Sequence, residues 1–193
     1  MSKGKLIIVE GAQGSYKTTV TRKLKSKMLY TVLLALTGVE DTSRSGSESA
    51  YLEHLSVLNM ADNCKGAGFN FVLDRSHLSE QVYNDVGYND HNFRSHFDGL
   101  NSYLNHLADD YDVYVYVLTA TEVSFLTRLQ RDKPNFADVT YSASNSLLQQ
   151  DAYVKLLDEM KSTYSSIHCK TIPTDGISSD AVVEYILKDI SES

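Results

Sequence analysis

Short apolar runs alternate along this chain with longer stretches in which apolar residues recur every three or four positions. The first run, residues 6–9, is continuous and rich in β-branched residues, which is typical of a strand buried on both faces of a parallel sheet. Further strands are predicted over 31–37, where a helix is also compatible with the pattern, and over 69–74, 111–118 and 171–173. The stretches between them predict helices over 18–28, 50–65, 78–84, 92–107, 122–132, 144–167 and 178–190.

This alternation of strands and helices predicts an α/β fold of three layers, in which helices cover both faces of a five-stranded parallel sheet. Residues 42–49 are rich in serine and charge and are expected to form an irregular connection. Ligands of such sheets bind outside the carboxyl ends of the strands. The segments that follow the strands are therefore the first place to look for chemistry.

Composition is that of a soluble globular protein and favours a single domain over residues 1–193, with 42% apolar and 22% charged residues. The apolar runs are far shorter than the roughly 20 residues that span a bilayer, so we expect no membrane partner. Cys64 and Cys169 lack a metal-ligand spacing and suit a reducing cytoplasm. A net charge of −7 argues against a protein whose main function is to bind the nucleic-acid backbone, but it is compatible with binding a small anionic substrate.

The segment after the first strand carries the most specific motif. It consists of Gly11, Ala12, Gln13, Gly14, Ser15, Tyr16, Lys17, Thr18 and Thr19. Glycines at such positions allow the main chain to turn off the strand and to wrap closely around phosphate, while the loop N–H groups and the helix N-terminus supply positive charge. A lysine and a threonine at the end of the loop hold the β- and γ-phosphates and Mg²⁺. The motif therefore predicts binding of ATP and Mg²⁺.

Tyr16 departs from this motif, because it stands where the last glycine belongs. If the position needs a positive φ, tyrosine costs about 1–2 kcal/mol there. The alternative interpretation is a glycine-containing turn between a strand and a helix, with Lys17 on the surface. The buried strand before the loop and the helix after it favour the phosphate loop.

A second cluster, Asp74 and Arg75, follows the strand over 69–74. A carboxylate at this place can hold Mg²⁺ or accept a proton from an attacking oxygen, and the arginine can bind the phosphate of an acceptor. A structural ion pair is the alternative. Further along, Arg128 and Arg131 are three residues apart and share one face of a helix, where they suit the transition-state charge of a transferred phosphoryl group or simply a solvated surface.

These motifs resemble the thymidylate kinase and deoxynucleoside kinase branch of P-loop kinases. GAQGSYKTT over 11–19, LDRSHLSEQVY over 73–83, RLQRD over 128–132 and IPTDG over 172–176 match its motifs in order and spacing. The resemblance implies a P-loop NTPase fold with a short lid at about 122–143, and transfer of the ATP γ-phosphate to a nucleoside or nucleoside monophosphate. It also implies that Arg44, Ser79 and Tyr83 bind the acceptor, and that the protein is a homodimer like many relatives.

Three features depart from that branch: Tyr16, Ser76 where thymidylate kinases carry tyrosine, and a lid that Lys133 and Pro134 end early. The number of arginines favours a monophosphate acceptor, whose phosphate Arg44, Arg75 and one lid arginine would bind.

Three other functions stay open. A deoxynucleoside acceptor would need a base, for which Glu40, Asp41 or Asp74 is suitable. A kinase of a hydroxyl group on DNA and a nucleotide-binding protein without turnover are the remaining alternatives. Aromatic residues after the second cluster would stack on a nucleobase in any of these, or belong to the core; they are Tyr83, Tyr88 and Phe93.

Overall fold

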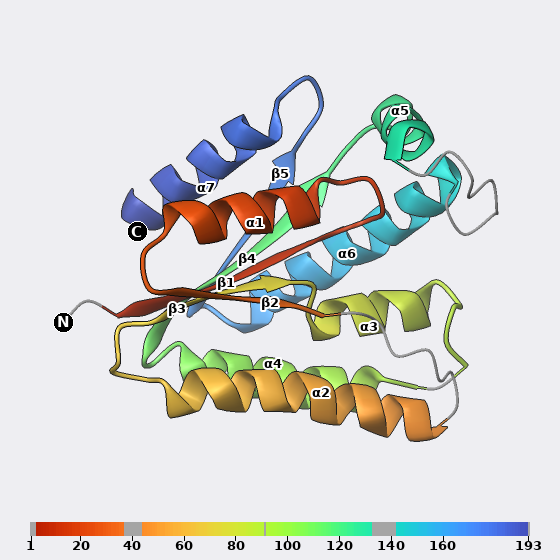
Figure 1. The fold of residues 1–193 in the computed structure, drawn as a ribbon. Helices are drawn as coiled ribbons and strands as arrows, with labels where there is room; N and C mark the ends of the chain where they lie inside the picture. Colours follow the sequence, from red (N-terminus) through yellow and green to blue (C-terminus); the bar gives the residue numbers. More distant parts are fainter. Residues whose placement is uncertain (1–2, 37–43, 91, 133–141, 193) are drawn as a thin grey trace.

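The computed structural model describes residues 3–36, 44–90, 92–132 and 142–192, and it has the predicted parallel sheet (Figure 1). The strand order is β2-β3-β1-β4-β5, and every neighbouring pair is parallel. The strands are β1 (Gly4–Gly11), β2 (Thr31–Ala35), β3 (Asn70–Asp74), β4 (Tyr111–Thr119) and β5 (Ile167–Pro173). The predicted fold class and all five strands are confirmed, and the pairing of β2 with β3 excludes the helical alternative for this segment.

Helices cover both faces of the sheet, as Figure 1 shows. They are α1 (Lys17–Lys27), α2 (Arg44–Asn63), α3 (His77–Asp85), α4 (Arg94–Leu107), α5 (Glu122–Asp132), α6 (Ala143–Thr163) and α7 (Ser179–Glu192). The strand side chains alternate between the two faces. Ile7 and Val9 pack in a core with α1 and α7, whereas Leu6 and Ile8 pack in a larger core with α2, α3, α4 and α6.

Several predicted boundaries are wrong, among them the strand predicted over 171–173, which begins at Ile167. The irregular connection over 42–49 is helical from Arg44 onward, and the buried Ser47 donates a hydrogen bond to the carbonyl of Asn92 at 3.4 Å. The polar composition that suggested a loop is the N-terminal turn of α2. The helix predicted over 144–167 ends at Thr163, because Tyr164 is extended and Ile167 already pairs with Val113 of β4.

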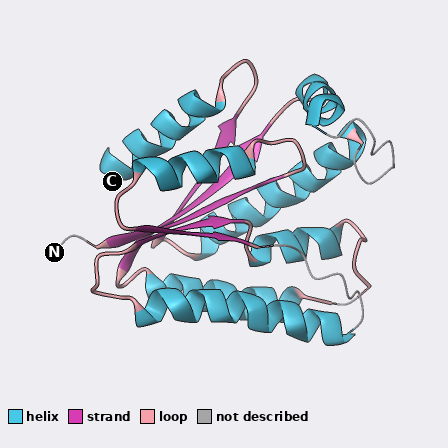
Figure 2. Ribbon diagram, viewed as in Figure 1, coloured by secondary structure: helices cyan, strands magenta, loops and turns pink. Residues whose placement is uncertain are grey.

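The register of the sheet brings the motifs to one edge. Val9 lies opposite Asp74 of β3, and Gly11 lies opposite Leu118 of β4. The phosphate loop, the Asp74–Arg75 cluster and the segment leading into α5 therefore follow neighbouring strands at the carboxyl edge of the sheet (Figure 2). Among the helices of the described residues, none is long and apolar enough to cross a membrane.

Two histidines lie buried among α2, α3 and α4. The rings of His54 and His77 are 6.2 Å apart, and His77 Nε2 lies 2.7 Å from Asn101 Oδ1. Burial lowers the pKa of His54 from 6.5 to about 3, with a smaller contribution from His77. Burial likewise lowers the pKa of His77 to about 4, although its bond to Asn101 acts in the opposite direction. Both imidazoles are therefore neutral in the folded protein at pH 7.

We expect these histidines to make the fold sensitive to acid. In the unfolded chain they bind protons near pH 6.5, whereas the fold resists protonation until about pH 4 or below. Their contribution to stability is thus complete above pH 6.5 and decreases as the pH falls, by roughly 1.4 kcal/mol per pH unit for each histidine. Urea unfolding at pH 7.5 and 5 measures this loss. His77→Phe should reduce the difference between the two pH values, whereas His106→Gln, at an exposed position, should not.

Candidate active site

The loop between β1 and α1 depends on two glycines. Gly11 has φ 141°, and a Cβ atom there would lie 2.5 Å from the carbonyl oxygen of Leu118. Gly14 has φ 77°, but a Cβ there would meet neighbours only at ordinary contact distances, from 3.5 Å. Gly11 is therefore required both by its conformation and by the close approach of β4, whereas Gly14 is required by its conformation alone.

The loop and the first turn of α1 surround a cavity of about 310 Å³, which is lined by Gln13, Gly14, Ser15, Tyr16, Lys17, Thr18, Thr19 and Arg75. Lys17 is the first residue of α1, and its Nζ donates a hydrogen bond to the carbonyl of Ala12 at 2.9 Å. Thr18 and Thr19 are exposed on the same turn. The loop residues, the first turn of α1 and Lys17 thus line one cavity, and main-chain N–H groups, a helix N-terminus and a lysine together are suited to phosphate.

Tyr16 adopts the conformation of the glycine that it replaces. Its φ is 74° and its ψ 6°, in the left-handed region, which costs a tyrosine about 1–2 kcal/mol. Its ring packs against the core formed with α1 and α7, and the guanidinium carbon of Arg128 lies 3.8 Å from the ring centroid. A cation–π contact of this kind contributes about 0.5–2 kcal/mol, which is comparable to the conformational cost.

The two arginines of α5 share one face of the helix, as their spacing predicts. Both approach Tyr16, with Arg131 more distant at 6.0 Å. Arg128 is buried, and it donates hydrogen bonds to the carbonyl of Gly14 at 3.2 Å and to Oγ1 and the carbonyl of Thr174 at 2.8 and 2.7 Å. Arg131 is exposed. Residues 133–141, including Lys133 and Pro134, lie outside the described residues, so the lid over 122–143 stays a prediction.

Arg75 faces the phosphate cavity from the end of β3. Its φ of 78° is a second left-handed conformation of a non-glycine residue at this site, and such strain concentrates at functional sites. The guanidinium donates to the hydroxyl of Tyr83 and, at 3.5 Å, to that of Ser79. Burial lowers the pKa of Arg75, but Tyr153, Tyr83 and Glu10 raise it on balance, so the group stays charged.

Glu10 is a site residue to which the residue patterns assign no role. Its buried carboxylate accepts hydrogen bonds from the main-chain N–H and the hydroxyl of Ser76, at 2.6 and 2.8 Å, and from the hydroxyl of Ser79 at 2.8 Å. Burial raises its pKa, and the charges of Arg75 and Lys17 with the two serine bonds oppose the change without cancelling it. A carboxylate directly after the apolar run over 6–9 was the available signal.

Tyr153 of α6 completes this network. It is fully buried, and its hydroxyl lies 2.8 Å from Ser79 Oγ. Because Ser79 donates its own proton to Glu10, Tyr153 donates to Ser79. Ser76 and Ser79 at the start of α3 thus hold the Glu10 carboxylate, and Tyr153 of α6 supports Ser79. Tyr153 carries no sequence signal, since it lies within a helix far from every motif.

Asp74 fits the predicted magnesium ligand. It is buried at the end of β3, and its Oδ1 has no hydrogen-bond partner among the described residues. No group of three histidine, cysteine, aspartate or glutamate residues suitable for a metal occurs in the described part of the chain. Mg²⁺ is generally held by one or two carboxylates together with substrate phosphates and water, so Asp74 and the hydroxyl of Thr18 are a suitable protein contribution.

Among the described residues predicted to bind the acceptor, to act as a base or to stack on a nucleobase, only Arg75 lines the cavity of the phosphate loop. Arg44 begins helix α2 instead of lying in a loop, and its side chain lies outside the described residues, as do Glu40 and Asp41. Phe93 is fully buried in the larger core, as the alternative interpretation predicts. Tyr83 and Tyr88 are partly buried with their rings 5.7 Å apart, and the Tyr83 ring lies 5.6 Å from the guanidinium carbon of Arg75.

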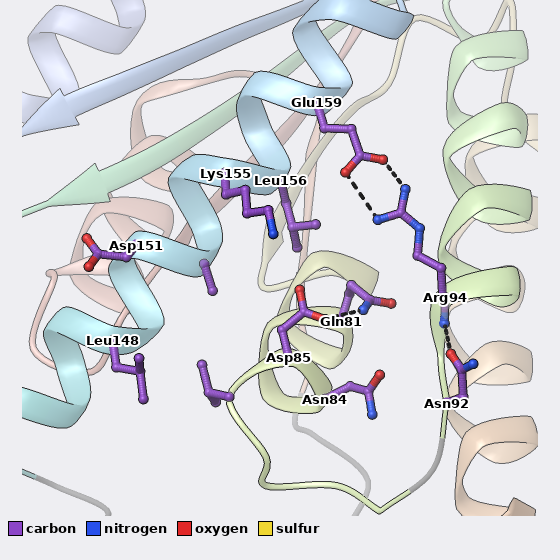
Figure 3. Close-up of a pocket in the computed structure, with 12 residues that line it drawn as sticks. Gln81, Asn84, Asp85, Asn92, Arg94, Leu148, Asp151, Lys155, Leu156 and Glu159 are labelled. Atoms are coloured by element: carbon purple, nitrogen blue, oxygen red, sulfur yellow. Dashed lines mark hydrogen bonds and ion pairs between the residues drawn. The ribbon is translucent and has the colours of Figure 1, made fainter.

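A second cavity, of about 590 Å³, lies between α3 and α6 and shares no lining residue with the first (Figure 3). Polar side chains from α3 and α6 line it, and Arg94 of α4 reaches across to Glu159 of α6 by two hydrogen bonds, one of them at 3.1 Å. Gln81 donates to Asp85 within it at 2.7 Å. This cavity holds none of the predicted site residues.

No protein-family model and no curated protein sequence matches the chain. Among solved structures, a thymidylate kinase from Candida albicans is similar with a TM-score of 0.66 and 17% identity, over 100% of this chain and 93% of that one. The YorR protein of Bacillus subtilis, in complex with phosphorylated GDP, has a TM-score of 0.69 and 19% identity over 97% and 96%. Deoxyadenosine kinase from M. mycoides, with bound dATP, has values of 0.65 and 14% over 96% and 99%. The chain therefore has the P-loop kinase fold found in thymidylate and deoxyadenosine kinases, as its motifs predict.

Proposed function

We propose that this protein transfers the γ-phosphate of ATP to a nucleoside monophosphate, with deoxynucleotides as the preferred class. The observation that carries the proposal is the single cavity that the phosphate loop and Arg75 line together. Lys17 and the loop amides would bind the donor phosphates, and Arg75 would bind the acceptor from the neighbouring strand. Two anions brought together by fixed cations are what phosphoryl transfer requires, because catalysis is mainly positioning and charge stabilisation.

The other roles follow from position and charge. Thr18 and Asp74 would hold Mg²⁺, which supplies charge neutralisation between the phosphates when bound. Arg131, exposed on the helix beside the loop, is suited to the transferred phosphoryl group. Tyr83 and Ser79 fix the guanidinium of Arg75, so the acceptor meets a preorganised cation. The printed ligands of the similar structures, phosphorylated GDP and dATP, are compatible with a nucleotide site of this kind.

One observation favours a nucleoside acceptor instead. Glu10 is a buried carboxylate that Ser79 links to Arg75, and a carboxylate beside the acceptor would be suited to take the proton of an attacking hydroxyl. A monophosphate needs no such proton transfer from a sugar hydroxyl, because its own phosphate oxygen attacks. The acceptor therefore has to be identified by assay.

A panel assay with labelled ATP and Mg²⁺ tests the proposal. The acceptors are each deoxynucleoside monophosphate, each deoxynucleoside and a DNA oligonucleotide with free hydroxyl groups. We expect label on one or more monophosphates with kcat/KM at least about tenfold above that of any nucleoside, which corresponds to about 1.4 kcal/mol. Label mainly on a nucleoside or on DNA would replace the proposed acceptor by that one. Binding of ATP without transfer to any acceptor would refute the proposed enzyme activity.

Arg75→Ala tests whether Arg75 binds the acceptor and not the donor ATP. Removing a charged partner of the acceptor phosphate should raise the KM of the acceptor by about 10- to 150-fold, since hydrogen bonds to charged groups contribute roughly 1.5–3 kcal/mol. The KM of ATP should change by less than threefold. Arg22→Ala, on α1 but outside the residues that line the cavity, is the control and should leave both values unchanged. Equal increases in both KM values would contradict the assignment of Arg75 to the acceptor.

A further inference from the structure

Arg128 is held in a way that differs from what a phosphate-binding arginine needs. It is buried, and its two terminal nitrogens donate to main-chain or hydroxyl oxygens of Gly14 and Thr174. Its guanidinium carbon lies over the Tyr16 ring, 3.8 Å from the centroid. A guanidinium with neutral oxygens on its donors and an aromatic ring on its face is already bound inside the protein.

These partners connect three parts of the edge of the sheet. Gly14 and Tyr16 belong to the phosphate loop, and Arg128 belongs to α5. Thr174 follows β5, and its main-chain N–H and hydroxyl both donate to the carbonyl of Thr119 at the end of β4, each at 2.8 Å. Arg128 therefore ties the phosphate loop to the ends of β4 and β5, which are rigid elements of the sheet.

The strained conformation of Tyr16 explains why a contact with Arg128 is useful at this place. The residue that occupies this left-handed position needs compensation, because a side chain other than glycine is strained there. The ring lies between the core of α1 and α7 and the guanidinium, so it is packed on both sides. A glycine at position 16 would free the backbone but would remove the surface on which Arg128 stacks.

We propose that Tyr16 and Arg128 form a stacked clamp that holds the phosphate loop in its ATP-binding shape, so that Arg128 acts as a positioning residue and does not contact the transferred phosphoryl group. The inference rests on the proposed function, because the loop must bind ATP for its shape to matter. Arg131, one turn later and exposed, is left as the α5 arginine for the phosphoryl group. Of the two α5 arginines, Arg128 should then depend more strongly on Tyr16, because it lies closer to the ring.

A double-mutant cycle on ATP binding tests the clamp. Arg128→Met should weaken ATP binding by about tenfold, measured by calorimetry, and raise the KM of ATP more than it lowers kcat. In a Tyr16→Leu background the same change should weaken binding by less than about threefold, because its stacking partner is already absent. Tyr16→Phe keeps the ring and should restore the full effect. Arg131→Met is the matched comparison: its guanidinium carbon lies 6.0 Å from the Tyr16 ring centroid against 3.8 Å for Arg128, so it should lower kcat and couple to Tyr16→Leu less than Arg128→Met does.

Other outcomes would refute the clamp or the proposed function. If Arg128→Met lowers kcat about 100-fold with unchanged ATP affinity, and does so equally with Leu at position 16, Arg128 contacts the phosphoryl group and the clamp is refuted. If the methionine variant does not fold, Arg128→Lys repeats the test, because it keeps the charge but loses the planar stacking surface. The clamp predicts that the lysine variant binds ATP more weakly than the wild-type protein. Absence of ATP binding in the wild-type protein would refute the proposed function, whereas binding without coupling would refute only the clamp.

Discussion

Lys17→Met should lower phosphoryl transfer by about 100-fold or more while the protein stays folded. Lys17 begins α1 and lines the cavity of the phosphate loop, where its ammonium group would face the charge that develops on the β- and γ-phosphates. Preorganised charges in such sites contribute several kcal/mol to the transition state, and one lost donor typically costs about 100- to 1,000-fold in kcat. Methionine keeps the length and apolar volume of the side chain, so the change removes mainly the charge.

Steady-state kinetics with the best acceptor of the panel measures this loss, and circular dichroism with urea unfolding confirms the fold. Lys23→Ala is the matched control on the same helix. Its ammonium pairs at the surface with Asp180 at 2.8 Å, and exposed pairs of this kind contribute about 0–1 kcal/mol, so turnover should stay within about twofold of wild type. A folded Lys17 variant that keeps wild-type turnover would mean that the loop does not perform the proposed chemistry.

The sequence predicts the sheet and the phosphate loop because local patterns determine both. Runs such as residues 6–9 identify buried strands, and the loop follows from glycine and lysine spacing after the first of them. The boundaries that failed involve tertiary context. Residues 44–49 look polar enough for a loop, but helix α2 incorporates them, and Ser47 is bonded across to Asn92. The pairing of Ile167 with β4 likewise ends α6 earlier than its own pattern suggests.

In the candidate site, too, some residues follow from local motifs and others only from tertiary contacts. Arg75 and Lys17 are predicted from motifs, and the structure brings them to one cavity. Tyr153 and the bonding of Glu10 cannot be read from spacing, because they join residues from distant parts of the chain. Tyr16 is recognised as an exception to the glycine motif, but its partner is 112 positions later on another helix, and only the fold brings the two side chains together.

The second large effect concerns stability, and it follows from the distinct surroundings of two glycines. Gly11→Ala should destabilise the fold by roughly 2–5 kcal/mol, the sum of about 1–2 for a side chain at an unfavourable positive φ and about 1–3 for forced overpacking. The new Cβ would lie 2.5 Å from the Leu118 carbonyl and 2.8 Å from Ser15 Oγ. The carbonyl belongs to the central β1–β4 pair, so it cannot move without disturbing the sheet.

Gly87→Ala isolates the conformational part of this cost. Gly87 has a φ of 80°, but a Cβ there would meet nothing within 4 Å. It should therefore cost only about 1–2 kcal/mol in urea unfolding at equal m-values. The difference between the two variants measures how closely β4 approaches the start of the phosphate loop. If both glycines give the same loss, Leu118 can yield to a methyl group, and the close packing that fixes this loop against the sheet is absent in solution.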